Sequence, residues 1–237
     1  MNNINTENRS VQILSMGVRL EGIVSIPDDP QGLVIFVHGS GSSHYSLRNQ
    51  YVAQTLQDAG LATLLFDLLT VSEETIDLRK HHLRFDIELL ARRTAGVLEW
   101  LDLQPFAYGL KRGLFGASTG AAAALIAAAE LPEKVDAIVS RGGRPDLAEE
   151  ALASVQTPTL LIVGGEDEAV IDLNQQALTE MQPGIDRKLI IVPGASHLFE
   201  EAGTLEQAAQ LTRDWFLAHL SPVSIRQVIR LLLDNKW

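Results

Sequence analysis

Residues 113–129 read Gly113-Leu-Phe-Gly-Ala-Ser-Thr-Gly120 and then Ala121-Ala-Ala-Ala-Leu-Ile-Ala-Ala-Ala129, and they decide the fold of this 237-residue chain. The stretch predicts a short apolar strand, a sharp turn and an alanine-rich helix. The turn carries the pattern Gly-x-Ser-x-Gly with Ser118 at its centre. Between a strand and a helix this pattern is typical of a nucleophile elbow, because small flanking residues let the serine hydroxyl project from the bend. The helix that follows directs its positive end toward charge developing near that hydroxyl. An ordinary strand-to-helix turn is the alternative.

Continuous apolar runs recur along the chain, and each predicts a strand covered on both faces. Strands that alternate with helices predict a mostly parallel sheet with helices on both faces, an α/β fold. No linker or repeat divides the chain, so we expect one domain over residues 1–237 with a core over about 11–220. The expected strands are 11–14, 18–26, 33–37, 62–66, 113–115, 137–139, 159–163 and 189–192, and the expected helices are 46–59, 86–103, 119–130, 170–180 and 204–220.

Two segments carry more specific expectations. The helix at 204–220 begins Thr204-Leu-Glu-Gln207, which has the form of a capping box. The segment 68–83 is polar, mixed in charge and without clear periodicity. It follows a strand, and loops at the carboxyl ends of strands surround the ligand crevice of an α/β sheet. We therefore expect a rim or lid loop there, with a plain connector as the alternative.

The composition excludes several classes of function. The net charge of −11 argues against nucleic acid and anionic membranes as partners, since both require basic patches. The chain has no cysteine, which excludes disulfides, thiolate metal sites and a cysteine nucleophile. The N-terminal residues lack the pattern of a signal peptide, and no apolar run is long enough to span a membrane. We expect a cytoplasmic protein.

Ser118 requires a base, a group that orients the base, and donors that hold an oxyanion. His197 follows the last apolar strand and precedes the last long helix, which makes it the candidate base. Asp167 follows strand 159–163 after a Gly-Gly turn and is the candidate orienting acid, with Glu166 as the runner-up. The resulting order, Ser…Asp…His, is that of Gly-x-Ser-x-Gly hydrolases. Alternatively, the acidic residues after this strand only cap the next helix.

The oxyanion hole of such a site uses the N–H of the residue after the nucleophile, here Thr119. The second N–H comes from the loop after the first central strand, and Ser40 in the glycine-rich segment 38–43 is the candidate. This loop lacks the lysine of a phosphate-binding P-loop. We expect His38 to serve loop geometry. His44 lies in the serine-rich loop that follows, and His81 and His82 lie in the 68–83 segment; we expect these three to contact substrate or solvent.

Four motifs in sequence carry a family resemblance: His38-Gly39-x-Gly41, Gly116-x-Ser118-x-Gly120, Gly165-x-Asp167-x-x-Val170 and Ser196-His197. Together they resemble an α/β-hydrolase over about residues 11–220. The compact size without an obvious cap is most similar to the dienelactone-hydrolase-like branch. The namesake enzymes of that branch use a cysteine in the elbow, whereas this chain has Ser118.

The resemblance therefore implies a serine esterase that cleaves the ester, lactone or thioester of a small-molecule acyl substrate, without cofactor or metal. Acyl transfer or peptide cleavage with the same residues is one alternative, and a non-catalytic binding scaffold is another. The segment Ser140-Arg141-Gly-Gly-Arg144-Pro-Asp146 offers Arg141 and Arg144 to an anionic substrate group, or to ion pairs with acids such as Asp146. The tail, 221–237, predicts an amphipathic helix that packs on its own domain, with a homodimer contact or a lid role as alternatives.

Overall fold

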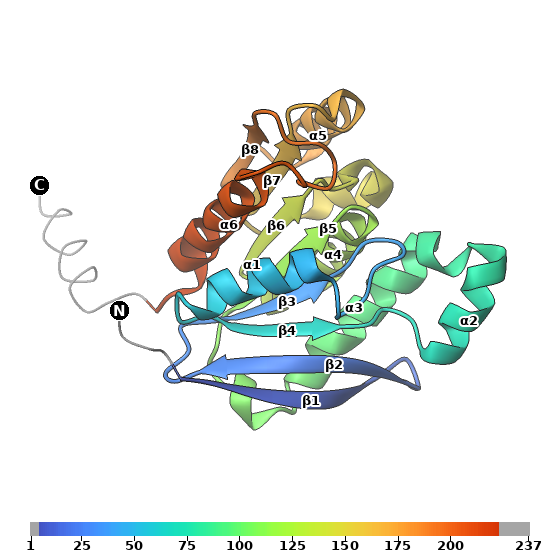
Figure 1. The fold of residues 1–237 in the computed structure, drawn as a ribbon, viewed down its shortest axis with the longest axis vertical. Helices are drawn as coiled ribbons and strands as arrows, with labels where there is room; N and C mark the ends of the chain where they lie inside the picture. Colours follow the sequence, from blue (N-terminus) through green and yellow to red (C-terminus); the bar gives the residue numbers. More distant parts are fainter. Residues whose placement is uncertain (1–4, 223–237) are drawn as a thin grey trace, which may run out of the picture.

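The computed structural model describes residues 5–222, which form one eight-stranded sheet in the order β1-β2-β4-β3-β5-β6-β7-β8 (Figure 1). Strands β3 to β8 run parallel, and β1 and β2 add an antiparallel hairpin at one edge. The α/β prediction with a mostly parallel sheet is confirmed. The strands are β1 Thr6–Ser15, β2 Val18–Pro27, β3 Leu33–Val37, β4 Ala62–Phe66, β5 Arg112–Ala117, β6 Ala137–Arg141, β7 Thr159–Gly164 and β8 Arg187–Val192.

The central strands are buried along their whole length, as their continuous apolar runs predict. Helices α1 and α6 cover one face, and α3, α4 and α5 contribute to the apolar core on the other. The helices are α1 Leu47–Gln57, α2 Val71–Lys80, α3 Ile87–Leu101, α4 Thr119–Glu130, α5 Glu168–Glu180 and α6 Thr204–Leu220, with short 3-10 helices η1 Leu83–Phe85, η2 Pro105–Ala107, η3 Pro132–Lys134 and η4 Pro145–Ser154.

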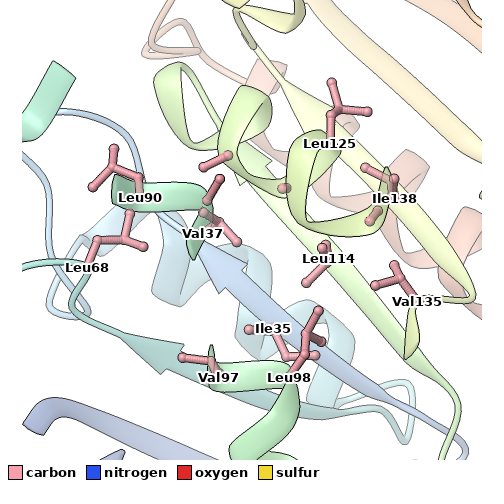
Figure 2. Close-up of a cluster of buried hydrophobic side chains, with 14 of the residues drawn as sticks. Ile35, Val37, Leu68, Leu90, Val97, Leu98, Leu114, Leu125, Val135 and Ile138 are labelled. Carbon is pink, nitrogen blue, oxygen red and sulfur yellow. The ribbon is translucent and has the colours of Figure 1, made fainter. Parts of the chain in front are cut away.

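Figure 2 shows the core on the α3 and α4 side of the sheet, where leucines from both helices meet the apolar side chains of the strands. Leu98 of α3 and Leu125 of α4 are fully buried there, as are Ile35 of β3 and Leu114 of β5. The run of alanines in α4 is buried almost throughout. Small side chains therefore bring α4 close to the sheet and hold its first residue directly behind the elbow.

The segment predicted as a rim or lid loop is a helix instead. Thr70 and Glu73 form a true capping box at the start of α2, since each side chain accepts a hydrogen bond from the other residue's N–H. Glu73 also pairs with Arg93 of α3 at 2.7 Å. Apart from Asp77, the helix buries none of its residues, so it has no apolar stripe for periodicity to reveal. In Figure 1, α2 lies beyond the carboxyl ends of β3 and β4.

The capping box predicted at Thr204 does not form. Gly203 is the N-cap of α6, and the Thr204 hydroxyl donates a hydrogen bond of 2.7 Å to the carbonyl oxygen of Glu201. The predicted tail helix at 221–237 lies outside the described residues, apart from Ser221 and Pro222. Within residues 5–222, none of the helices combines the length and the apolar composition needed to cross a bilayer.

Candidate active site

The bend at Ser118 has the backbone geometry of a strained turn. Its φ of 50° and ψ of −122° lie in a region that L-residues rarely adopt, at a cost of about 1–3 kcal/mol. The flanking glycines are needed for close packing. A Cβ on Gly116 would lie 2.4 Å from the Cα of Ala121, and one on Gly120 would lie 2.1 Å from the carbonyl oxygen of Val37. No other residue fits at these two positions unless the backbone moves.

The end of β6 and the residues after it brace this bend from the side. The N–H of Ser118 donates to the carbonyl oxygen of Arg141 at 3.3 Å, and the N–H of Arg144 donates to the carbonyl oxygen of Ser118 at 3.0 Å. Between them, Gly142 adopts a φ of 50° close to the backbone of His197. Both main-chain polar groups of Ser118 are thus bonded to residues 141 and 144, and its carbonyl oxygen also accepts from the N–H of Ala121 at 3.1 Å.

Ser118, His197 and Asp167 lie in contact at the carboxyl ends of β5, β8 and β7. Nδ1 of His197 lies 2.6 Å from Oδ2 of Asp167, and Nε2 lies 3.4 Å from Oγ of Ser118. A carboxylate only accepts, so Nδ1 carries the proton and Nε2 faces the serine hydroxyl as an acceptor. The imidazole side chain is 37% exposed, which leaves this nitrogen accessible to a bound molecule.

The two candidate acids, Asp167 and Glu166, differ in their contacts. Asp167 occupies the N-cap position of α5, yet its side chain makes no capping hydrogen bond and bonds to His197 instead. The side chain of Glu166 is exposed. Asp167 is therefore the acid that contacts the imidazole, and helix capping does not account for it.

The two residues with the candidate oxyanion donors, Ser40 and Thr119, are hydrogen-bonded to each other. The N–H of Ser40 donates a hydrogen bond of 2.9 Å to Oγ1 of Thr119. Thr119 is the first residue of α4, where a backbone N–H has no partner within the helix. A Cβ on Gly39 would lie 3.0 Å from the Cβ of Ser118, so the loop after β3 lies directly against the elbow.

Two histidines near this loop have structural roles. His38 is buried; its Nδ1 donates to the carbonyl oxygen of Gly39 at 2.9 Å, and its Nε2 accepts from the N–H of Leu68 at 3.1 Å. Burial lowers the pKa of His38, which keeps the ring neutral. The solvent exposure expected for His44 is wrong, because its ring is buried and lies 2.8 Å from Oδ2 of Asp67; its contact with substrate stays a prediction. Sequence reasoning missed this pair, although Asp67 directly follows β4 much as Asp167 follows a strand.

Neither arginine of the 140–146 segment presents a guanidinium that is both exposed and unpaired. Arg144 forms a two-point ion pair with Asp146 at 2.8 and 2.7 Å, which raises the pKa of the arginine. Arg141 is buried, with its guanidinium 5.7 Å from the ring centre of Phe115 and 6.0 Å from that of Phe199. Burial lowers the pKa of Arg141 to about 10. An anion-binding role for these residues stays a prediction.

A cavity of about 310 Å³ lies between the loop 38–43 and α2. It borders Gly39 and Ser40, the residues that contact the elbow. Leucines form much of its wall, and Glu74 is among its polar groups. Burial and the nearby charge of Asp67 raise the pKa of Glu74.

The comparisons with known proteins identify the family to which this fold belongs. Residues 32–156 match the family model described as alpha/beta hydrolase fold. The crystal structure of a dienelactone hydrolase from Anabaena variabilis is 56% identical, covers 91% of this chain and 99% of its own, and superposes with a TM-score of 0.89. The chain therefore belongs to the α/β-hydrolase family and is dienelactone-hydrolase-like, as its motifs predict.

More distant structures share the fold alone. Est1E from Butyrivibrio proteoclasticus is 17% identical, covers 88% of this chain and 98% of its own, and has a TM-score of 0.73. Among curated proteins, one from each of two Mycobacterium tuberculosis strains is 56% identical over 210 residues; each is named "Putative phosphoribosyl transferase". The match covers 89% of this chain but 46% of theirs, so the chain spans about half the length of these relatives.

Proposed function

We propose that this chain is a serine hydrolase that cleaves a carboxylic ester, lactone or thioester of a small molecule. The observation that carries the proposal is the continuous contact from Ser118 Oγ through the imidazole of His197 to the carboxylate of Asp167. A nucleophile, its base and the group that orients the base are the parts that acyl transfer to water requires. The strained turn that presents Ser118 supports the same conclusion.

In the proposed reaction, Nε2 of His197 takes the hydroxyl proton while Oγ of Ser118 attacks the carbonyl carbon. The tetrahedral oxyanion accepts hydrogen bonds from the N–H groups of Thr119 and Ser40. Collapse breaks the bond to the leaving oxygen or sulfur, and His197 returns the proton to that atom. Water, deprotonated by the same nitrogen, then attacks the acyl carbon; the bond to Oγ of Ser118 breaks, and His197 returns the proton to Oγ as the acid leaves. Asp167 keeps the imidazole in the required tautomer throughout and stabilises its charged form.

No observation favours a different reaction. The name phosphoribosyl transferase belongs to proteins of which this chain matches less than half. Acyl transfer and peptide cleavage would use the same three residues, and the partition of the acyl-enzyme between water and an added acceptor distinguishes them from hydrolysis. A pure binding scaffold has no need of a strained serine in contact with a histidine.

The test is covalent labelling with a fluorophosphonate, which reacts with activated serines. Purified protein is incubated with the probe beside Ser118→Ala, His197→Ala and, as a matched control, Ser10→Ala, which changes an exposed serine of β1. We expect one adduct, located on Ser118 by mass spectrometry. It is absent in Ser118→Ala, much slower to form in His197→Ala and unchanged in the control. A folded protein that forms no adduct contradicts the proposal and favours a binding scaffold.

A further inference from the structure

The cavity beside the loop 38–43 has the size of a subsite rather than of a complete binding pocket. Its volume of about 310 Å³ is at the lower end of the range for small-molecule sites. One part of its wall is apolar and the other is polar. The apolar part consists of Leu68, Leu69, Leu78 and Leu90, and the polar part includes Ser40, Ser42, Ser43 and Glu74.

The wall formed by α2 is held in place at several points. Glu73 pairs with Arg93 of α3, and Asp77 pairs with Arg84 of η1. Asp77 also accepts the N–H of Leu83 at 2.7 Å. The cavity is therefore part of the folded structure and does not depend on closure of a loop.

The position of the cavity indicates which part of a substrate enters it. Gly39 and Ser40 border it and also contact Ser118 and Thr119, which do not themselves line it. Among the described residues that line it, none belongs to the His197 loop, 194–200. A leaving group must lie beside His197 to receive its proton. The group that stays on the serine, the acyl group, therefore extends away from His197 and past Ser40.

The charges in the wall indicate the chemistry of that acyl group. Asp77 is neutralised by Arg84, and His38 is held neutral by burial. Asp77, Arg84 and Glu74 all line the cavity, and while Arg84 pairs with Asp77, the carboxyl of Glu74 forms no ion pair with the described residues. A carboxylate at this position accepts a hydrogen bond from a hydroxyl and repels a second carboxylate.

We propose that this cavity is the acyl subsite, that it takes an uncharged, partly apolar acyl group whose hydroxyl donates to Glu74, and that it disfavours acyl groups ending in a carboxylate. This inference rests on the proposed function, because the acyl group is defined by attachment to Ser118.

The experiment compares p-nitrophenyl esters of benzoic acids that carry a para hydroxymethyl, methyl or carboxylate group, with p-nitrophenyl acetate as the small reference. For the unaltered protein we expect kcat/KM to fall in the order hydroxymethyl, methyl, carboxylate. Glu74→Leu should lower the hydroxymethyl-to-methyl ratio about tenfold, the effect of losing a hydrogen bond to a charged group. Glu74→Gln should raise the rate with the carboxylate ester relative to the methyl ester.

A second pair of variants tests the space itself. Leu78→Trp should fill the rim of the cavity and lower the ratio of benzoate to acetate hydrolysis. Leu103→Trp is the matched control, since Leu103 is 74% exposed and Leu78 is 68% exposed, and it should leave that ratio unchanged.

The outcomes separate this inference from the proposed function. If Ser118 is labelled and the acetate is hydrolysed, but the ratios are the same in every variant, the subsite is wrong and the serine hydrolase stands. If neither labelling nor ester hydrolysis occurs in the folded protein, both are overturned.

Discussion

The backbone N–H of Ser40 is bonded to the side-chain oxygen of Thr119 at 2.9 Å, so one of the two proposed oxyanion donors is already satisfied in the free protein. An incoming carbonyl oxygen must displace that hydroxyl before the N–H of Ser40 can stabilise the oxyanion. The hydroxyl stands in for the substrate oxygen, and turning it away requires only a rotation about χ1. The N–H of Ser40 therefore has a hydrogen-bond partner before a substrate binds.

Removal of this competing acceptor should increase activity. We expect Thr119→Ala to raise kcat/KM about fivefold, the equivalent of one ordinary hydrogen bond of about 1 kcal/mol that the substrate no longer has to replace. Thr119→Ser retains a hydroxyl and should behave like the unaltered protein. Steady-state kinetics with p-nitrophenyl acetate decides the question. A large fall in kcat for Thr119→Ala would mean instead that the hydroxyl itself donates to the oxyanion.

The two neighbouring acids should differ sharply in their effect on the rate. Asp167→Asn favours the wrong tautomer of His197 and should lower kcat by about 10⁴-fold, as in other Ser-His-Asp sites. Glu166→Gln changes an exposed side chain of the same turn and should leave kcat largely unchanged, because Asp167 is the acid bonded to His197. Both variants are measured at saturating substrate after their folding is checked by circular dichroism. Equal effects of the two changes would contradict the assignment of Asp167.

Gly120, two residues after the nucleophile, should tolerate no side chain. Gly120→Ala places a Cβ against the backbone oxygen of Val37, which has no way to move aside, and should cost at least about 1–3 kcal/mol. Gly184→Ala is the matched control, because a Cβ at that position meets nothing within 4 Å. Urea unfolding curves of the two variants give the comparison. A Gly120→Ala protein as stable as the control would contradict the close packing of α4 against β3.

Acid should loosen α2 before the rest of the fold. Burial opposes the charge of Glu73 and Asp77, but the hydrogen bonds from Arg93 and Arg84 prevail and hold both pKa values below their usual 4.5 and 3.8. A lowered pKa contributes stability that is present above the usual value and is lost as the pH falls through the folded value. Hydrogen exchange in α2, normalised to intrinsic rates and compared with α4, should therefore accelerate below about pH 4. Exchange that stays parallel in the two helices would contradict this.

The buried guanidinium of Arg141 should not be needed for stability. Its Nε and Nη1 atoms are buried and make no hydrogen bond to the described residues, so much of its desolvation is uncompensated. Arg141→Met keeps an apolar contact with the two phenylalanine rings and should raise the free energy of unfolding by about 1 kcal/mol. Urea unfolding measures this. A clear loss of stability would show that the cation itself holds the rings together. A loss of activity confined to anionic esters would support the predicted anion contact.

The arrangement of the sheet and the contacts of Ser118 follow from local signals. Apolar runs such as 33–37 and 159–163 predict strands that are buried on both faces. The carboxyl ends of parallel strands lie at the same edge of the sheet. Asp167 and His197 therefore reach the elbow although they are far from it in sequence. These are the parts of the site that a single sequence can predict.

Helix α2 and the cavity beside it could not be predicted, because they depend on polar groups that pair over long distances in the sequence. Helix α2 is held by ion pairs with Arg93 and Arg84, and no local sequence pattern identifies these pairs. The capping box at Thr70 is the one local pattern that indicates the start of this helix. The same box pattern at Thr204 was misleading, because Gly203 takes the capping position. Residues of α2 form part of the wall of the cavity, so the cavity could not be predicted without the helix.

The brace on Ser118 has a consequence for which changes the site can absorb. Both bonds use main-chain atoms, of residue 141 at the end of β6 and of residue 144 after it. Substitution of these side chains leaves the bonds in place, whereas one added or deleted residue between them shifts the register and moves the nucleophile. The segment is therefore tolerant of sequence variation but strict in length, and any relative with a working elbow should preserve the spacing from 141 to 144 even where the arginines differ.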